Sequence, residues 1–336
     1  MTVVSSPATR ESARLAAESL ARAKALVTPA LDTAVRRLCP ELRPAVSEHL
    51  AGGGKFVRAG IVLSAAAAAG GEAEAALVGG VAIELVHNFS LIHDDIIDRD
   101  LERRHRPTVW AEHGVGHAII AGDALATLAF QVLLEEPSAE RVRAAVRLAE
   151  ATQAMIAGQA EDMASELRNT LSVEECLHME AGKTGALLSC AAAMGAILAG
   201  ATASTIEALA DFGRHLGIAF QAIDDVLGIW GEPAVTGKAV GNDLRQHKKT
   251  LPIALALARG GELPARLERL LEGELTESQV QEATRVLEHC GAREETMAIG
   301  ETQLCAALGS LERVALEFGP RSELAAIAHY VTERDR

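Results

Sequence analysis

Three aspartates, Asp94, Asp95 and Asp98, close an apolar segment of the sequence, and their spacing could bind a divalent cation. If the segment is helical, Asp94 and Asp98 lie one turn apart on the same face. Carboxylates this close repel one another and are costly to bury unless a cation neutralises them. Hard oxygen ligands suit Mg²⁺, which normally bridges carboxylates to phosphate oxygens. A solvated helix end would carry the same acidic run, so the motif alone leaves both interpretations open.

A second acidic pair, Asp224 and Asp225, ends another apolar run just before a polar segment. We expect the two acidic helix ends to face one another across a cavity and to hold several divalent ions. A diphosphate ligand would also need cationic side chains to meet its oxygens. Each basic pair alone fits a solvated surface better, but together they favour a diphosphate site. The basic residues are Lys55, Arg58, Arg103, Arg104, Lys183, Lys238, Lys248 and Lys249.

Long helices are expected to position these side chains. Apolar residues recur at helical spacing over residues 10–37, 115–134, 139–168 and 203–228. Ser172–Glu175 and Thr276–Gln279 are capping-box sequences that open further helices. No long alternating strand pattern occurs, so we predict a single all-α domain over residues 1–336, with residues 1–9 disordered. Loops are predicted at 231–242 and at Pro40, Pro44, Pro107, Pro137, Pro233, Pro264 and Pro320.

Composition limits the classes of protein that fit. The 336 residues are 49% apolar and only 3% aromatic, which favours a helical core over a sheet. A net charge of −14 disfavours a nucleic-acid partner. Five scattered cysteines and the absence of a signal-peptide pattern indicate a reduced, cytoplasmic protein. Residues 184–206 carry no charge, but their small side chains favour a buried helix over a membrane span.

Several motifs occur together in one order from Gly53 to Pro252. They are GGKFVR, ELVHNFSLIHDDIID, RRHRPT, AGDAL, GQAED, GKTGAL, QAIDD and KKTLP. In this order the chain resembles the trans-polyprenyl diphosphate synthases of the class I isoprenoid synthase fold, which is a large helical bundle with a central cavity. Residues 253–336 match the family only loosely, as a helical tail.

The resemblance implies that two substrates bind through their diphosphates. Asp94, Asp98 and Asp224 would bind Mg²⁺, three ions with substrate present, on the diphosphate of an allylic substrate, with Asp95 and Asp225 in support. The cations implied to contact that same diphosphate are Arg103, Lys183, Lys238 and Lys248.

The second substrate implied by the resemblance is isopentenyl diphosphate. Thr184 and Gln221 would face the reacting carbons while the allylic diphosphate ionises, the isopentenyl double bond attacks the resulting cation, and a proton is eliminated. A homodimer is also implied. The residues implied to hold isopentenyl diphosphate are Lys55, Arg58, His87 and Arg104.

The chain departs from the family pattern at three motif positions. Gly228 replaces the usual last Asp of the second acidic motif, from which we expect weaker Mg²⁺ binding rather than an inactive protein. Phe56 and Ala59 stand where Arg and Pro are usual, which leaves the first anion site less charged. Cys176 occupies a position where Tyr is frequent, and the sequence offers no explanation for it.

Product length in this family depends on the residues just before the first acidic motif, here Phe89 and Ser90. A large ring would block a growing chain, and the serine beside it leaves some room. The resemblance therefore favours a C20 product, geranylgeranyl diphosphate, with C15 and C25 as alternatives. Ordinary core packing explains Phe89 equally well.

Three other functions fit parts of the sequence. A metal phosphohydrolase would use His93 and Asp94 but would leave the second acidic pair unexplained. A terpene cyclase on the same fold could use Asn242 and Asp243, and a catalytically weak regulatory subunit would fit Gly228. We expect His93 to make a structural hydrogen bond. The polar residues expected to form buried supporting bonds are Asp123, Gln159 and Asp162.

Overall fold

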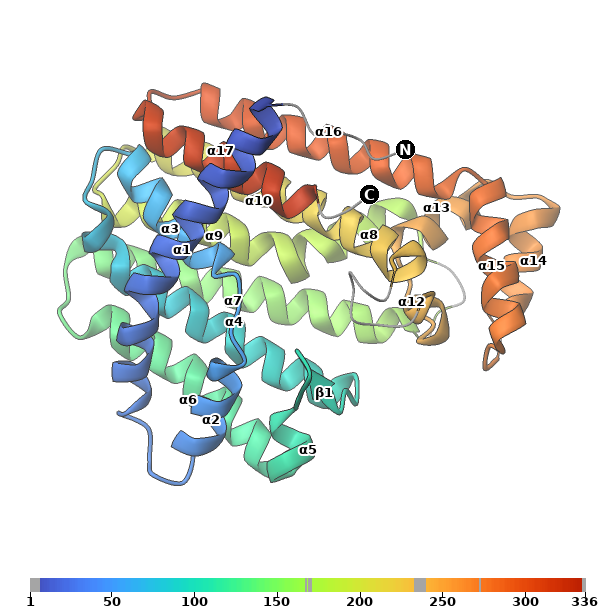
Figure 1. The fold of residues 1–336 in the computed structure, drawn as a ribbon, viewed down its shortest axis with the longest axis horizontal. Helices are drawn as coiled ribbons and strands as arrows, with labels where there is room; N and C mark the ends of the chain where they lie inside the picture. Colours follow the sequence, from blue (N-terminus) through green and yellow to red (C-terminus); the bar gives the residue numbers. More distant parts are fainter. Residues whose placement is uncertain (1–6, 167, 169–170, 233–239, 272, 334–336) are drawn as a thin grey trace. The chain divides into compact units, whose positions relative to one another are not determined.

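The computed structural model describes residues 7–166, 168, 171–232, 240–271 and 273–333, and helices dominate them (Figure 1). The chain forms two compact units. The first unit contains residues 1–152, 187–210 and 310–330, and the second contains residues 153–186, 211–309 and 331–336. The all-α prediction is confirmed. The prediction of a single domain over residues 1–336 stays a prediction.

Among the described residues, seven helices lie entirely within the first unit. They are α1 (Pro7–Val35), α2 (Arg43–Ala51), α3 (Val57–Ala68), η1 (Ala73–Ala76), α4 (Leu77–Ile97), α5 (Val109–His113) and α6 (Val115–Leu134). Five helices contribute residues to both units: α7 (Ala139–Glu166), α9 (Ala186–Leu198), α10 (Ala203–Trp230), α16 (Ala292–Glu312) and α17 (Phe318–Thr332). The second unit also contains α8 (Val173–Glu180), η2 (Ala181–Gly185), α12 (Asn242–Arg245), α13 (Leu251–Ala258), α14 (Glu262–Leu270) and α15 (Glu277–His289).

Helix α4 is the centre of the first unit. It packs against α1, α3 and α6, and its residues from Gly79 to Val86 are all buried. A helix that is apolar all round is stable only when it is surrounded by protein. The buried run ends at the carboxylates, where the N–H of Asp98 donates to the carbonyl of Asp94 at 2.8 Å. Burial of α4 therefore fixes where the first acidic motif lies.

Glycines allow helices to approach one another closely in this unit. A Cβ on Gly195 of α9 would lie 2.2 Å from the carbonyl oxygen of Val62 on α3. A Cβ on Gly79 of α4 would lie 2.9 Å from the sulfur of Met194. Helix α9 thus packs backbone to backbone against α3, and its Met194 side chain packs against the backbone of α4.

A short antiparallel hairpin follows α4 and contains the only strands among the described residues, β1 (Glu102–Arg103) and β2 (Arg106–Pro107). Its two turn residues, Arg104 and His105, have φ of 54° and 59°. Two positive φ values suit a two-residue hairpin turn but are uncommon for residues other than glycine, asparagine or aspartate. The hairpin lies beside the end of α4, as Figure 1 shows.

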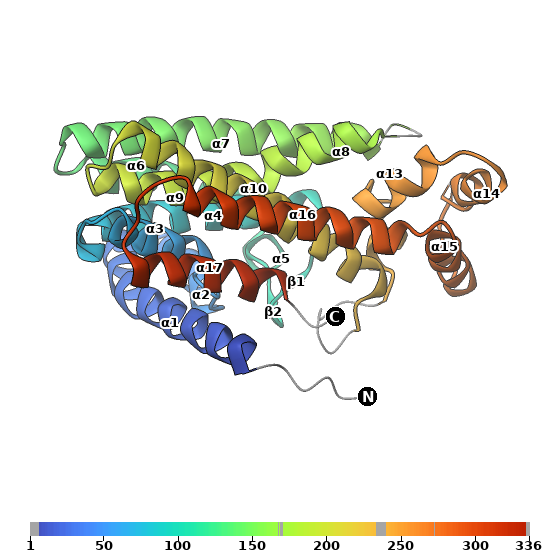
Figure 2. The same ribbon diagram turned by 90° about the horizontal axis from the view of Figure 1, so that it is seen from above.

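The second unit has its own core around α13. Leu251, Ile253 and Ala256 of α13 are buried with residues of α8, α10, α14 and α15, among them Ile229 and Leu287. Pro252 lies in the first turn of α13, where its missing N–H costs no helical hydrogen bond. Figure 2 shows α13, α14 and α15 grouped together in this unit.

Most predicted helix boundaries agree with the structure. Both capping boxes are present, at Ser172–Glu175 and Thr276–Gln279. Helix α1 begins at Pro7, within the segment predicted to be disordered, and residues 1–6 are outside the described residues. The loop predictions at four prolines are wrong. Pro44, Pro264 and Pro320 lie in the first turns of α2, α14 and α17, and Pro107 lies in β2. Of the predicted loop 231–242, residues 233–239, which include Pro233 and Lys238, lie outside the described residues.

Three helical stretches are long and apolar enough to cross a bilayer by length and composition alone: Ala73–Ile97, Val115–Leu134 and Val173–Leu198. Protein surrounds 67% and 61% of the most apolar windows in the first and third. Burial accounts for the apolar character of these two, as predicted for the uncharged segment 184–206, whereas 39% of the window in Val115–Leu134 is buried. Hydropathy by itself is not evidence of a membrane span.

Replacing Gly195 with Ala should destabilise the fold. The added methyl would meet the backbone oxygen of Val62 at 2.2 Å, so a helix must move rather than a side chain. We expect a loss of about 1–3 kcal/mol in the free energy of unfolding, measured by urea denaturation. The control is Gly309→Ala in α16, where nothing lies within 4 Å of the added Cβ. It should raise stability by up to about 1 kcal/mol, since alanine favours helix. Equal effects at both positions would contradict the packing argument.

Candidate functional site

The aspartates at the end of α4 have two different environments. Asp94 and Asp98 are half-buried and lie one helical turn apart on one face. Asp95 is fully buried, and its Oδ1 accepts a hydrogen bond of 2.6 Å from Nε of Arg103. Burial, opposed by the charge of Arg103, raises the pKa of Asp95 to about 6. Asp94 and Asp98 are therefore the pair suited to an ion, while Asp95 anchors the hairpin to α4.

Cationic side chains gather near the start of α3 in the same unit. Arg58 donates from NH1 to Nε2 of His87 at 3.2 Å. Burial, with the charges of Arg58 and Arg104, lowers the pKa of His87 well below its usual value. His87 is therefore a neutral imidazole that accepts at Nε2, and its proton is on Nδ1. Lys55 lies over the ring of Tyr330, with 5.2 Å between Nζ and the ring centroid.

Glycine and a buried acid complete this cationic cluster. A Cβ on Gly54 would lie 3.4 Å from NH1 of Arg104, so the guanidinium lies against the glycine backbone. The buried carboxylate of Glu84 accepts from the N–H of Ala59 at 3.1 Å, which holds the first turn of α3. Its burial raises the pKa of Glu84, and the charges of Arg58 and Arg104 oppose that shift. Several cations thus surround one buried acid, and the excess of positive charge suits an anion.

Strained backbone occurs within this cluster. Phe56, which precedes α3, has a φ of 52°, and Arg104 and His105 are also left-handed. Such conformations cost free energy and persist where surrounding structure enforces them, often at binding sites. Lys24 also lies over the Phe56 ring at 5.9 Å, so the phenylalanine at the position of the family's arginine lies beside another cation.

In the second unit a chain of hydrogen bonds connects the GKTG motif to the second acidic pair. Thr184 donates from Oγ1 to Oε1 of Gln221 at 2.9 Å, and Nε2 of Gln221 donates to Oδ1 of Asp225 at 2.9 Å. The other oxygen of Asp225 accepts from the N–H of Leu251 at 2.8 Å. Asp225 is buried, and burial raises its pKa to about 6. Both its oxygens are thus used in holding α10, η2 and α13 together, while Asp224 beside it is half-buried.

The GKTG motif lies in a π-helical turn, η2. Such wide turns often occur at functional sites. A Cβ on Gly217 of α10 would lie 2.3 Å from Cα of Gly185, and one on Gly158 of α7 would lie 2.5 Å from N of Lys183. Lys183 pairs with Asp162 of α7 at 2.5 Å. Close backbone contact on two sides therefore fixes the direction of the Lys183 side chain.

Glu180 is a buried acid that the sequence interpretation missed. Burial and the neighbouring charge of Asp225 raise the pKa of Glu180 well above its usual value. The thiol of Cys176 donates to Oε1 of Glu180 at 3.4 Å and lies 3.6 Å from the carbonyl oxygen of Lys249. A small, weakly polar side chain at 176 is thus matched to an acid one turn later. The i, i+4 spacing of Cys176 and Glu180 was the available signal.

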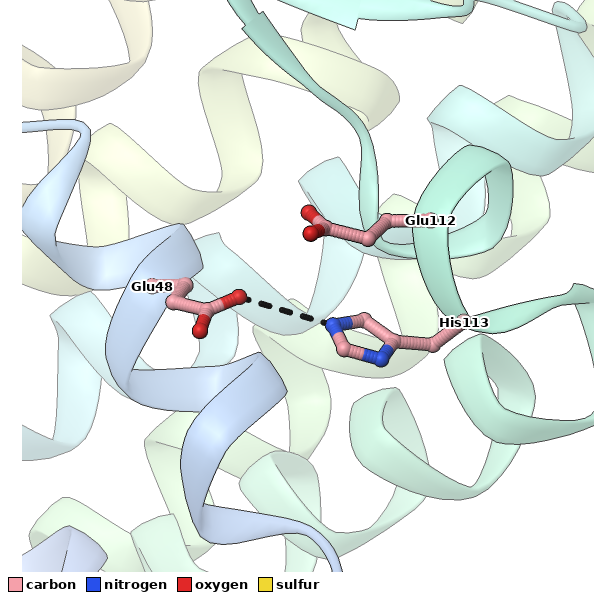
Figure 3. A group of neighbouring side chains, drawn as sticks. All are labelled: Glu48, Glu112 and His113. Atoms are coloured by element: carbon pink, nitrogen blue, oxygen red, sulfur yellow. Dashed lines mark ion pairs between the residues drawn. The ribbon is translucent and has the colours of Figure 1, made fainter.

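A different group of potential metal ligands is visible in Figure 3. Glu48 of α2 and Glu112 and His113 of α5 place ligand atoms within 4.8 Å of one another. Glu48 and His113 form an ion pair of 3.5 Å. All three side chains are exposed, and water satisfies exposed acids without a metal. This is the only such triad among the residues that the structure describes, and it contains none of the predicted aspartates.

The donor chemistry of the predicted aspartates nevertheless fits Mg²⁺. Asp94 and Asp98 offer hard oxygen atoms from one face of α4, and Asp224 offers another in the second unit. Next to the second acidic pair, a Cβ at Gly228 would lie 1.9 Å from Oδ2 of Asp243, so a carboxylate fills the space beside that glycine.

The structure distributes the predicted residues between the two units. Asp94, Asp95, Asp98, Lys55, Arg58, His87, Phe89, Ser90, Arg103 and Arg104 lie in the first, and Lys183, Thr184, Gln221, Asp224, Asp225 and Lys248 lie in the second. Their roles stay predictions, and Lys238 lies outside the described residues.

The predictions for the supporting polar residues have mixed outcomes. His93 makes the expected structural hydrogen bond, because its Nε2 lies 3.1 Å from the carbonyl oxygen of Ile119. Asp162 is bonded to Lys183, as expected of a supporting residue. The prediction for Asp123 is wrong, since its side chain is 68% exposed on α6. Gln159 was expected to be hydrogen-bonded, but its buried Oε1 has no partner among the described residues.

Comparison with known proteins identifies the family. The polyprenyl synthetase family model matches residues 40–288. The (2E,6E)-farnesyl diphosphate synthase of Mycobacterium tuberculosis is 43% identical over 332 residues, which cover 94% of this chain and 92% of the relative. The geranylgeranyl diphosphate synthase of the same species is 40% identical over 306 residues, 87% of each chain.

A solved structure agrees with these matches. The crystal structure of a polyprenyl synthetase from Streptomyces coelicolor A3(2) superimposes with a TM-score of 0.89 at 43% identity, covering 94% of this chain and 98% of that chain. The chain belongs to the polyprenyl synthetase family. It is a prenyltransferase, an enzyme that transfers alkyl groups.

Two histidines beside the cationic cluster should make stability depend on pH. Burial, with the charges of Arg103 and Arg104, lowers the pKa of His49 from 6.5 to about 4. Between these pH values the unfolded chain binds a proton at His49 that the folded chain does not. His49 therefore contributes stability that is present above pH 6.5 and is lost as the pH falls toward 4. His87 acts in the same sense.

The test compares variants, because Asp95 and Glu84 have raised pKa values and act in the opposite sense. In the His49→Gln variant, the free energy of unfolding should fall less steeply as the pH is lowered than it does in the wild type. The difference between the two slopes should be up to about 1.4 kcal/mol per pH unit. Urea denaturation between pH 7.5 and pH 4.5 measures this. His178→Gln on the surface of α8 is the control, and parallel curves for both variants would refute the assignment.

Proposed function

We propose that this protein is a Mg²⁺-dependent synthase that condenses isopentenyl diphosphate with an allylic diphosphate into a short-chain all-trans prenyl diphosphate. The observation that carries the proposal is the arrangement within the first unit. Two carboxylates, Asp94 and Asp98, end the same buried helix whose middle holds His87 against Arg58. Acids suited to Mg²⁺ thus end one buried helix, and cations suited to a second anion lie against the middle of the same helix.

The cationic cluster is proposed to bind isopentenyl diphosphate. Lys55, Arg58 and Arg104 would meet the diphosphate oxygens, and neutral His87 would donate from Nδ1. At a net charge of −14 the protein surface repels anions at long range, so a local cluster is needed to bind one. The left-handed backbone at Phe56 and Arg104 would hold these side chains ready for the ligand.

The acidic motifs are proposed to bind the allylic diphosphate. Asp94, Asp98 and Asp224 would hold the Mg²⁺ ions, three with substrate bound, with Asp95 and Asp225 in support. When bound, these ions supply Lewis-acid stabilisation of the departing diphosphate. Arg103 is oriented for the same anion by Asp95, and Lys183 is oriented by Asp162. Lys238 and Lys248 are proposed as further contacts to it.

Thr184 and Gln221 are proposed to stabilise the allylic cation that forms when the diphosphate leaves. Their oxygens are 2.9 Å apart, and both are electron-rich groups held in place through Asp225. Oriented dipoles that do not need to rearrange stabilise developing charge more effectively than solvent does. No nucleophilic side chain is required by this chemistry.

Product length is proposed to depend on Ser90. Ser90 lies four residues before Asp94 and therefore on the same face of α4, with its hydroxyl donating to the carbonyl of His87 at 2.8 Å. Phe89 is turned away from that face and packs edge-on against His93, with 5.0 Å between ring centroids. Gly122 leaves room for His93, because a Cβ there would lie 2.2 Å from its Nε2. A small residue on the Asp94 face favours a C20 product, whereas the 43% identity to a farnesyl diphosphate synthase favours C15.

A homodimer in the cytoplasm is proposed as the working form. Apolar side chains are exposed along α6 and the start of α7, and a second copy of the chain would cover them. All five cysteines are free thiols, as a reducing compartment maintains. The exposed residues are Val115, Ile119, Ile120, Leu134, Val142 and Val146.

The function is tested by a double-mutant cycle that measures the energetic coupling between the two acidic motifs. Purified protein should convert isopentenyl diphosphate and an allylic diphosphate only when Mg²⁺ is present. Asp98→Asn and Asp224→Asn should each lower kcat/KM by about 100-fold or more. Because both residues are proposed to act on one diphosphate, the double variant should lose much less than the product of the single losses.

The control for this cycle is Glu102→Gln, which removes an exposed acid from β1. Multiplicative losses would show that the two motifs act independently. Turnover that requires an added homologous subunit would instead favour the regulatory-subunit interpretation, and a cyclic hydrocarbon product would favour a terpene cyclase.

Product analysis by mass tests the length assignment. We expect a C20 product from the wild type and a shift to C15 for Ser90→Phe, because the new ring lies on the Asp94 face. Phe89→Ala is expected to give a longer product, and an unchanged length would exclude Phe89 from the assignment. Phe318→Ala, at an exposed ring on α17, is the matched control and should change nothing. A wild-type C15 product, or an unchanged product from Ser90→Phe, would overturn the assignment.

A further inference from the structure

The second acidic motif lacks a carboxylate that the first one has. On α4 the spacing places Asp94 and Asp98 on one face, and on α10 the matching pair is Asp224 and Gly228. A third carboxylate from the second motif would therefore project from position 228. Because residue 228 is a glycine and has no side chain, the space one turn beyond Asp224 is open to another residue.

The carboxylate of Asp243 occupies that space. A Cβ built on Gly228 would lie 1.9 Å from Oδ2 of Asp243, 2.5 Å from its Cγ and 3.1 Å from its Oδ1. These distances are too short for a side chain at position 228 to coexist with the carboxylate of Asp243 in its present position. Gly228 is therefore the residue that admits Asp243 to this position, and any larger residue would displace it.

The backbone that carries Asp243 is held firmly against α10. The N–H of Gly241 donates to the carbonyl of Ile229 at 3.1 Å, one residue beyond Gly228. Leu244 is fully buried in the core of the second unit, beside Val280 and Ile229. The carbonyl of Asp243 accepts from the N–H of Lys248 at 3.0 Å. The backbone at Asp243 is thus anchored on both sides, and its carboxylate lies at Gly228 of α10.

We propose that Asp243 supplies the carboxylate that Gly228 lacks, so that Asp224 and Asp243 bind Mg²⁺ at the second acidic motif of this chain, with Asp225 in support. The inference rests on the proposed function and adds a residue to its metal site. Three acids gathered at one helix end repel one another, and a divalent cation offsets that repulsion. The weaker Mg²⁺ binding expected from Gly228 in the sequence is then not expected of the folded protein.

The test measures metal binding directly and uses inorganic pyrophosphate as the probe. Isothermal titration of full-length protein with Mg²⁺, with pyrophosphate present, gives the Mg²⁺ concentration at half-saturation. Asp243→Asn keeps the shape of the side chain and removes its charge, so we expect this concentration to rise at least tenfold. Glu277→Gln is the matched control, because it removes one acid that pairs with Arg245 of the same helix without touching the cluster. It should change the value less than twofold.

A second test moves the carboxylate from position 243 to position 228 on α10. Gly228→Asp alone should lower the thermal midpoint, since the new side chain collides with Asp243. The double variant Gly228→Asp with Asp243→Gly should restore the midpoint and bring Mg²⁺ affinity to within threefold of the wild type. If Asp243→Asn does not fold, the double variant decides the question by the same measurements.

Two outcomes overturn the inference while leaving the proposed function intact. One is a Mg²⁺ requirement of Asp243→Asn no higher than that of Glu277→Gln, in a protein whose wild type turns over substrate. The other is a double variant that folds but binds Mg²⁺ more weakly than Asp243→Asn. Failure of the proposed function has a different signature, because the wild type itself would then show neither Mg²⁺-dependent pyrophosphate binding nor turnover.

Discussion

The structure depends on the neutralisation of buried acidic side chains by neighbouring cations or by protonation. Asp95 is buried against Arg103 and Glu84 against Arg58 and Arg104, and burial beside Asp225 raises the pKa of Glu180. An isolated charge in such places would cost several kcal/mol. Each of these buried acids therefore has a cationic partner or a raised pKa, and the acids suited to an ion are the half-buried Asp94, Asp98, Asp224 and Asp243.

Backbone contacts provide the rigidity that this balance needs. Gly217 and Gly158 allow α10 and α7 to touch the turn that carries Lys183 and Thr184. Gly122 admits His93 beside Phe89 in the same way. Close-packed helices have little room to move, so side chains on them keep more constant positions than side chains on loops. A site built this way is organised before substrate binds, which is the condition for electrostatic stabilisation of a short-lived cation.

Much of the fold followed from local patterns. Uninterrupted apolar periodicity predicted the long helices, and the Ser172 and Thr276 capping boxes predicted where two of them begin. Proline positions misled, because the sequence does not show whether a proline ends one helix or opens the next. The residues DDIID and GKTG were recognisable as chemistry, since their types and spacing restrict what they can do. Glu180 was not, because along the chain it does not differ from Glu174 and Glu175, the exposed acids of the same helix.

The sequence by itself determined the all-α class, the family and the identity of the charged residues, because these depend on neighbours along the chain and on motif order. Tertiary structure decided how those residues divide their tasks. Asp95 became an anchor for Arg103, His87 became neutral, and Gly228 became the space for Asp243. Burial and contacts between distant segments set protonation, direction and available volume, and none of these quantities is local to the chain.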